Sequence, residues 1–140
     1  MAPLQKRALY SLLIGLILSI TLAIVFIIKG VDNFDEDLSF RIIVYVMWVG
    51  VPLVHLILVD ASLRKPEQID ERDRLIKERA PRIQWMAVVF SLAAWVIVLT
   101  EHYGDQGQVP LAFLTLIMIS TLIVSILSLS IGILIGYWRG

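Results

Sequence analysis

The chain has 140 residues, 59% of them hydrophobic, and a mean hydropathy of +0.85. Water-soluble domains lie nearer half apolar, so this composition excludes an ordinary soluble fold and favours a membrane protein. The formal net charge is zero. The chain has no cysteine, and this absence excludes disulfides, thiolate metal ligands and cysteine nucleophiles.

The first two apolar runs are predicted to be membrane helices. Residues 8–28 are enough to cross the ~30 Å hydrocarbon core of a bilayer. This run ends at Lys29 and Gly30, a cation and a glycine that favour a helix C-terminus. The second run, residues 41–59, contains Pro52, which predicts a kink near mid-membrane. Backbone polar groups in lipid must be satisfied within the segment, so we predict helices rather than strands.

A compact charged segment, residues 64–82, separates the second and third apolar runs. Its acids come mostly early and its bases late, an order that complements the helix macrodipole. Oppositely charged residues also recur at the i,i+4 spacing that permits ion pairs on a helix, namely Asp70–Arg74, Asp73–Lys77, Arg74–Glu78 and Glu78–Arg82. We therefore predict a short charged helix, broken or bent at Pro81.

The charged segment has three possible roles. It is a solvated helix that fixes the membrane topology, a surface that docks a partner, or a binding site for anionic lipid headgroups. Each exposed ion pair contributes only ~0.2–0.5 kcal/mol, so local stability alone is a poor reason for so many charges. The candidate interaction residues are Asp70, Glu71, Arg72, Arg74 and Glu78.

The last two apolar runs, residues 83–100 and 110–137, are predicted to be the third and fourth membrane helices. Pro110 is a favoured first-turn residue for the fourth. One face of that helix carries a stripe of small residues: Thr121, Ser125, Ser128, Gly132 and Gly136. Small residues let helix backbones approach closely in lipid. The stripe therefore predicts packing within the chain or, alternatively, an oligomer face.

Asp70-Glu71-Arg72, Leu75-Ile76 and Glu78-Arg79-Ala80 stand just before the third predicted helix. In this motif and in its four-helix layout, the chain resembles an uncharacterised family of small predicted membrane proteins from bacteria and archaea, in which an Asp-Glu-Arg stretch precedes the third helix. The resemblance implies architecture and no chemistry. It also implies a multi-pass protein of the cell membrane, the inner membrane of a prokaryote.

The basic residues predict how the helices are oriented. Of the twelve lysines and arginines, only Lys29 and Arg41 lie on the side of the two loops that join the first run to the second and the third run to the fourth. The other ten lie in the N-terminal segment, in the charged segment or at the C-terminus. The positive-inside rule then places both termini and the charged segment in the cytoplasm.

Ionisable residues within membrane helices are candidates for functional sites by default. His55 and Asp60 are the candidates here, about 7–8 Å apart along the second helix. Asp60 is expected to be an interfacial acid paired with Arg64 or Lys65, and His55 a neutral imidazole bonded to a neighbouring helix. The alternative is a proton-relay or ligand role that the two residues share.

We therefore expect an all-α bundle of four transmembrane helices in one membrane domain. We expect no catalytic residues, no metal, no cofactor and no nucleic-acid partner, because no nucleophile–base arrangement, ligand cluster or phosphate loop is visible. The favoured function is a packing or accessory component that contacts the lipid bilayer as a homo-oligomer or as a subunit of a membrane complex. The alternative is an oligomeric channel or transporter for a small ion or molecule, and a lipid-modifying enzyme is a more remote one.

Overall fold

The structure is a computed structural model that describes residues 2–62 and 70–139, with only the helical backbone for residues 55, 56 and 58–62. The described residues form five helices and no strand. The helices are α1 (Pro3–Lys29), α2 (Asn33–Glu36), α3 (Leu38–Ser62), α4 (Glu71–Tyr103) and α5 (Ala112–Arg139). The predicted all-α class is confirmed.

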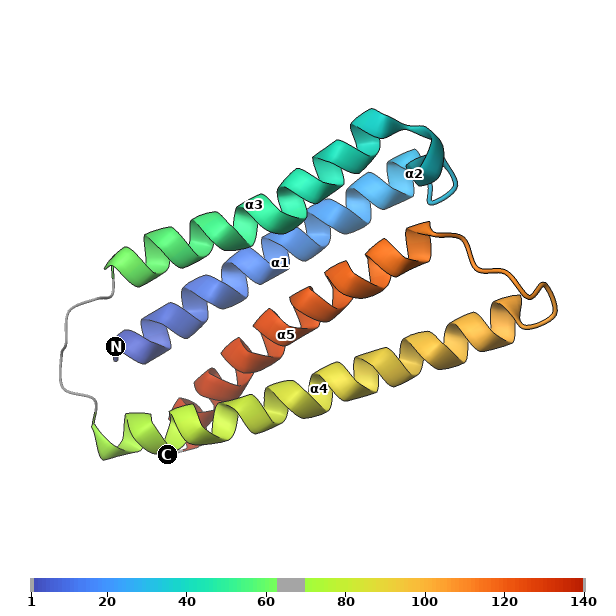
Figure 1. Ribbon diagram of the computed structural model, residues 1–140. Coiled ribbons are helices and arrows are strands. Elements are labelled where there is room, and N and C mark those ends of the chain that lie inside the picture. The colour runs from blue at the N-terminus through green and yellow to red at the C-terminus, as the bar shows by residue number, and fades with distance from the viewer. Residues whose placement is uncertain (1, 63–69, 140) are drawn as a thin grey trace.

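The four long helices lie side by side in the order α3, α1, α5, α4 (Figure 1). The most extensively packed pair is α4–α5, followed by α1–α5 and α1–α3. Both chain termini, the end of α3 and the start of α4 gather at one end of this row, which we call the terminal end. The connection through α2 and the connection between α4 and α5 lie at the opposite end, which we call the loop end. Successive long helices therefore run antiparallel.

Local backbone chemistry fixes the turn between α1 and α3. Gly30 ends α1 with a φ of +78°, a left-handed conformation that favours glycine, and its N–H bonds the carbonyl of Phe26 at 2.9 Å. Asp37 then caps α3, because its Oδ1 accepts hydrogen bonds from the N–H groups of Ser39 (2.9 Å) and Phe40 (3.3 Å). The predicted stop at Lys29 and Gly30 is confirmed.

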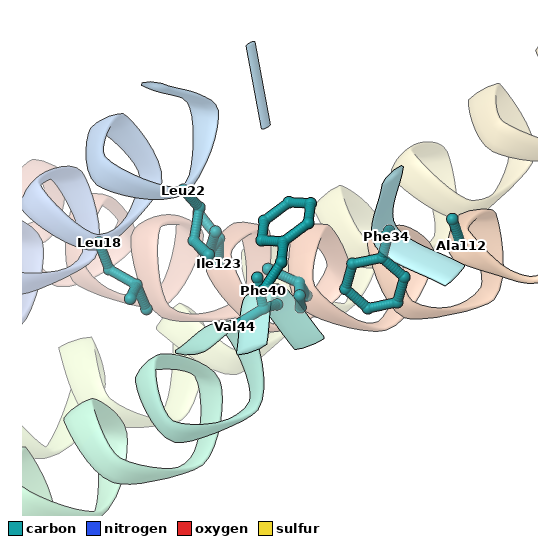
Figure 2. Close-up of a cluster of buried hydrophobic side chains, with 8 residues drawn as sticks. Leu18, Leu22, Phe34, Phe40, Val44, Ala112 and Ile123 are labelled. Carbon is teal, nitrogen blue, oxygen red and sulfur yellow. The ribbon is translucent and has the colours of Figure 1, made fainter. Parts of the chain in front are cut away.

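An apolar core lies between α1, α2, α3 and α5 toward the loop end (Figure 2). Phe34 and Phe40 are almost fully buried, with their rings edge to face at 5.5 Å between centroids. Phe26 contacts both rings. Side chains from α1, α3 and α5 complete the core: Leu18, Leu22, Val44, Ala112, Ile119 and Ile123. The short helix α2 thus closes the α1–α3 turn with a buried aromatic side chain.

The charged segment and the third apolar run are not separate helices. α4 is one helix of 33 residues that continues through Pro81, whereas the sequence predicted a short charged helix followed by a membrane helix from residue 83. Its first turns are held by packing against α5, where Ile76 and Ala80 are buried. Tertiary packing therefore outweighs the hydrogen bond that Pro81 cannot donate. Residues 64–69 of the predicted segment lie outside the described residues.

Three helices, α1, α4 and α5, are long and apolar enough to cross a membrane. The fourth candidate, α3, has 25 residues, but its described apolar part is the shorter stretch Leu38–Val54. The chain therefore has the character of a membrane protein. The fourth predicted helix, residues 110–137, begins two residues later in the structure, since α5 starts at Ala112. Pro110 precedes the helix, and its carbonyl oxygen accepts a hydrogen bond from the N–H of Phe113 at 3.1 Å.

Candidate functional site

The charged residues at the start of α4 form a structured helix N-terminus. Asp70 has extended backbone angles, and its Oδ1 accepts a hydrogen bond from the N–H of Glu71 at 2.8 Å, as a helix-capping residue does. Glu71 and Asp73 follow in the first turn. Their negative charges lie at the positive end of the helix dipole and stabilise it. The first residue of the predicted Asp-Glu-Arg motif is thus a cap.

Arg72 and Asp73 contact the end of α5 through Tyr137, and we call these three residues the terminal cluster. A guanidinium nitrogen of Arg72 donates to the Tyr137 carbonyl oxygen at 2.7 Å. The same guanidinium lies 5.6 Å from the centre of the Tyr137 ring, within cation–π range. The Tyr137 hydroxyl donates to Oδ1 of Asp73. The cluster therefore joins the first turn of α4 to the last turn of α5.

The predicted interaction residues divide into two groups. Asp70 and Arg72 have roles within the chain, as a cap and as a contact to α5. Glu71, Arg74 and Glu78 remain exposed, with Arg74 Nε and Glu78 Oε1 at 3.4 Å in the expected i,i+4 pair. Sequence reasoning did not include Asp73 and Tyr137 among the site residues.

Next to the terminal cluster, small residues of α5 allow α4 and α5 to approach each other closely. A Cβ atom placed on Gly136 would lie 2.9 Å from two side-chain carbons of Ile76. At Gly132 the nearest atoms would be Ile83 Cδ1 at 3.4 Å and Ala80 Cα at 3.5 Å. The C-terminal part of the predicted small-residue stripe, Gly132 and Gly136, therefore packs against α4 in the same chain.

Polar contacts continue the α4–α5 seam toward the loop end. Gln84 Nε2 donates to Ser125 Oγ at 2.5 Å, and Trp95 Nε1 donates to Ser120 Oγ at 2.8 Å. Such bonds between helices are worth about 0.6 kcal/mol each on average in membrane proteins. Because this contribution is small, these bonds matter more for the register of α4 on α5 than for the stability of the fold.

Two grooves flank this seam at the terminal end. One, of about 310 Å³, lies between α4 and α5, and its lining includes Arg72, Arg79 and Arg139. The other, of about 440 Å³, lies between α1, α4 and α5, with Arg7 and Lys77 among its lining residues. Both grooves also have apolar walls. We call them the arginine groove and the α1 groove. Both combine cations with an apolar surface.

The backbone of α3 contains His55 and Asp60, but their side chains lie outside the described residues. Their predicted roles stay predictions. Within the described part of the chain, no group of three or more His, Cys, Asp or Glu side chains is placed to hold a metal ion.

No protein-family model, curated protein or solved structure matches the chain. The resemblance to the family of small four-helix membrane proteins therefore stays a prediction. Function has to be argued from the contacts of this chain's own residues.

Proposed function

We propose that the chain is a non-catalytic component of a cell-membrane assembly, in which it crosses the bilayer four times with both termini in the cytoplasm. The assembly is a homo-oligomer or a larger membrane complex. The observation that carries this proposal is the continuity of α4. With 33 residues it extends about 50 Å, whereas a bilayer core is about 30 Å thick. Its charged first turns therefore project from the membrane as a rigid extension of the span.

The four-crossing topology is supported by the arrangement of the helices. α3 runs beside α1 in the same row (Figure 1), and its 25 residues extend about 37 Å, enough to cross a bilayer core. Four crossings return the C-terminus to the side of the N-terminus, as both lie at the terminal end. Lys29 and Arg41 lie near the loop end, whereas the other eight basic residues of the described part of the chain lie in the halves of α1, α4 and α5 nearer the terminal end. The positive-inside rule then makes the terminal end cytoplasmic.

The assembly role is supported by what the two ends of the helix row present. Toward the loop end, aromatic and aliphatic side chains fill the space between α1, α2, α3 and α5, which favours a packing role over an aqueous transport path. The terminal end presents the exposed side chains of Glu71, Arg74 and Glu78 on the projecting part of α4. A partner bound to these charges would be held rigidly relative to the membrane.

The topology is tested by labelling single cysteines, which is clean because the protein has none of its own. Cysteine at Arg74 should react with a membrane-impermeant maleimide only after the cells are permeabilised. Cysteine at Asp105, in the connection between α4 and α5, should react in intact cells. The opposite pattern, or labelling of both sites from one side, contradicts the topology.

The assembly is tested with two charge-neutral double variants. Arg74→Gln/Glu78→Gln removes the exposed pair on α4, and Lys29→Gln/Asp37→Asn removes a pair at the loop end, where Nζ and Oδ2 are 3.8 Å apart. Native gels of gently solubilised membranes should show the wild type well above its monomer mass of 15.8 kDa. The first variant should shift toward the monomer and the second should not. A monomeric wild type, or an unchanged first variant, contradicts the proposal.

A further inference from the structure

The arginine groove concentrates positive charge at one side of the α4–α5 seam. Arg72 and Arg79 of α4 and Arg139 of α5 all line it, and no acidic side chain of the described residues does. Arg72 uses a nitrogen to bond the Tyr137 carbonyl. A guanidinium has five N–H donors, so Arg72 keeps several for another acceptor.

The sequence of α4 explains why this face is uncompensated. Arg72 and Arg79 are seven residues apart, two helical turns, and so lie on the same face. No residue three or four positions away from either of them is acidic, so neither has an ion-pair partner at helical spacing. The acids lie on other faces, where Glu78 pairs with Arg74 and Asp73 bonds Tyr137.

The rest of the groove is apolar. Leu75 and Ile83 of α4 and Ile135 of α5 line it beside the arginines. Ile83 begins the apolar run of α4, so the groove passes from the cationic turns of the helix into its membrane-facing part. Its volume of about 310 Å³ lies at the lower end of small-ligand sites, enough for part of a lipid and not for a whole one.

A ligand that fits such a groove is an amphiphile with an anionic head and an apolar tail. Guanidinium groups bind phosphate oxygens in a planar, bidentate geometry. Basic pockets between membrane helices on the cytoplasmic side are suited to phospholipid headgroups. We infer that the arginine groove binds an anionic phospholipid of the surrounding bilayer, with Arg72, Arg79 and Arg139 on its phosphate and the tops of its acyl chains against Leu75, Ile83 and Ile135. This inference rests on the membrane location in the proposed function.

The test compares two double variants that remove the same charge from the terminal end. Arg79→Gln/Arg139→Gln empties the groove of two arginines and keeps Arg72, which contacts Tyr137. Arg74→Gln/Lys77→Gln is the matched control, because neither residue lines the arginine groove. Lys77 lines the α1 groove, so the control also reports on the alternative site. The full-length protein is purified in a mild detergent and titrated with phosphatidylglycerol or phosphatidylcholine, and lipid binding is measured by native mass spectrometry.

The wild type should bind the first phosphatidylglycerol more tightly than phosphatidylcholine. Each groove arginine is expected to contribute about fivefold, so the groove variant should lose about 25-fold in phosphatidylglycerol affinity. Its phosphatidylcholine binding and its unfolding in sodium dodecyl sulfate (SDS) should stay as in the wild type, which shows that the fold is intact. The control should change less than about twofold. Equal losses in both variants would mean diffuse surface attraction, and a larger loss in the control would place the lipid in the α1 groove.

Either of these results, or equal affinity of the wild type for the two lipids, overturns the inference. The measurement uses purified protein in detergent, so it depends on neither the orientation of the chain in a membrane nor its assembly with partners. A failure of the proposed function and a failure of this lipid site are therefore seen in different experiments.

Discussion

The two glycines near the end of α5 predict opposite responses to the same substitution. Gly136→Ala places a methyl group 2.9 Å from Cγ1 and Cγ2 of Ile76. Ile76 is buried and β-branched, so its side chain is largely fixed in one rotamer on a helix and cannot turn away. Gly132→Ala meets its neighbours at 3.4–3.6 Å, which is ordinary van der Waals contact. The first substitution overpacks the seam and the second fits it.

The magnitude follows from the difference between the two sites. Alanine in place of a helical glycine favours the helix by up to about 1 kcal/mol, and this gain is common to both variants. Overpacking a well-packed site costs about 1–3 kcal/mol and applies to Gly136→Ala alone. We therefore expect Gly132→Ala to be as stable as the wild type or more stable, and Gly136→Ala to be less stable than Gly132→Ala by about 1–3 kcal/mol. Gly132→Leu, which has no room beyond the first methyl group, should also be destabilised.

The assay is reversible unfolding of the purified protein as SDS is titrated into mild detergent micelles, followed by far-ultraviolet circular dichroism. Gly50→Ala is the control for helix propensity, because the added methyl group would meet only Val46 Cγ1, at 4.0 Å on the same helix. Equal stabilities of the two α5 alanine variants, or a Gly132→Ala variant below Gly136→Ala, would refute the packing of α4 on α5 in this register.

Three further outcomes are expected in the same unfolding assay. Asp73→Ala and Tyr137→Phe should each destabilise the protein, and the double variant should cost less than the sum of the two single variants, because each single variant already removes the same hydrogen bond, worth about 1–3 kcal/mol; strictly additive losses would mean that the bond contributes nothing. Trp95→Phe removes the bond to Ser120 Oγ and should cost no more than about 2 kcal/mol, and Ser120→Ala alone should cost a similar amount. Phe34→Ala leaves a cavity in the aromatic core and should cost about 3–5 kcal/mol, so a loss below about 1 kcal/mol would show that α2 does not pack as described.

The helical content of the chain could be predicted because apolar length and glycine placement are local signals. The stop at Lys29 and Gly30 needs only a cation in the last turn and a residue that tolerates a positive φ. Asp70 was not predicted as the cap of α4, although the cap and the acids of the first turn are adjacent in sequence. The Arg74–Glu78 pair follows from helical spacing alone.

The remaining features depend on contacts that spacing does not encode. Pro81 predicts a helix break from its missing N–H, and the prediction fails because α5 holds the turns on both sides of it. Asp73 is spaced to pair with Lys77, but it accepts a hydrogen bond from Tyr137, 64 residues away. The positive face at Arg72 and Arg79 did carry a local signal, the lack of acids at helical spacing. The groove itself could not be predicted from spacing, because it forms between α4 and α5 and its third arginine, Arg139, belongs to α5.

The order of the helices in the row has a consequence for how the protein is made. Gly15 of α1 packs against Leu127 of α5, so a principal neighbour of the first helix is the last to be synthesised. At about 5–20 residues per second, the ribosome needs on the order of ten seconds to add the intervening chain. Throughout that interval the α5-facing side of α1 is open to lipid or to an insertion factor. Premature termination before α5 would leave the α1–α3 pair without the helix that joins it to α4, so such fragments should be cleared by membrane proteases rather than accumulate.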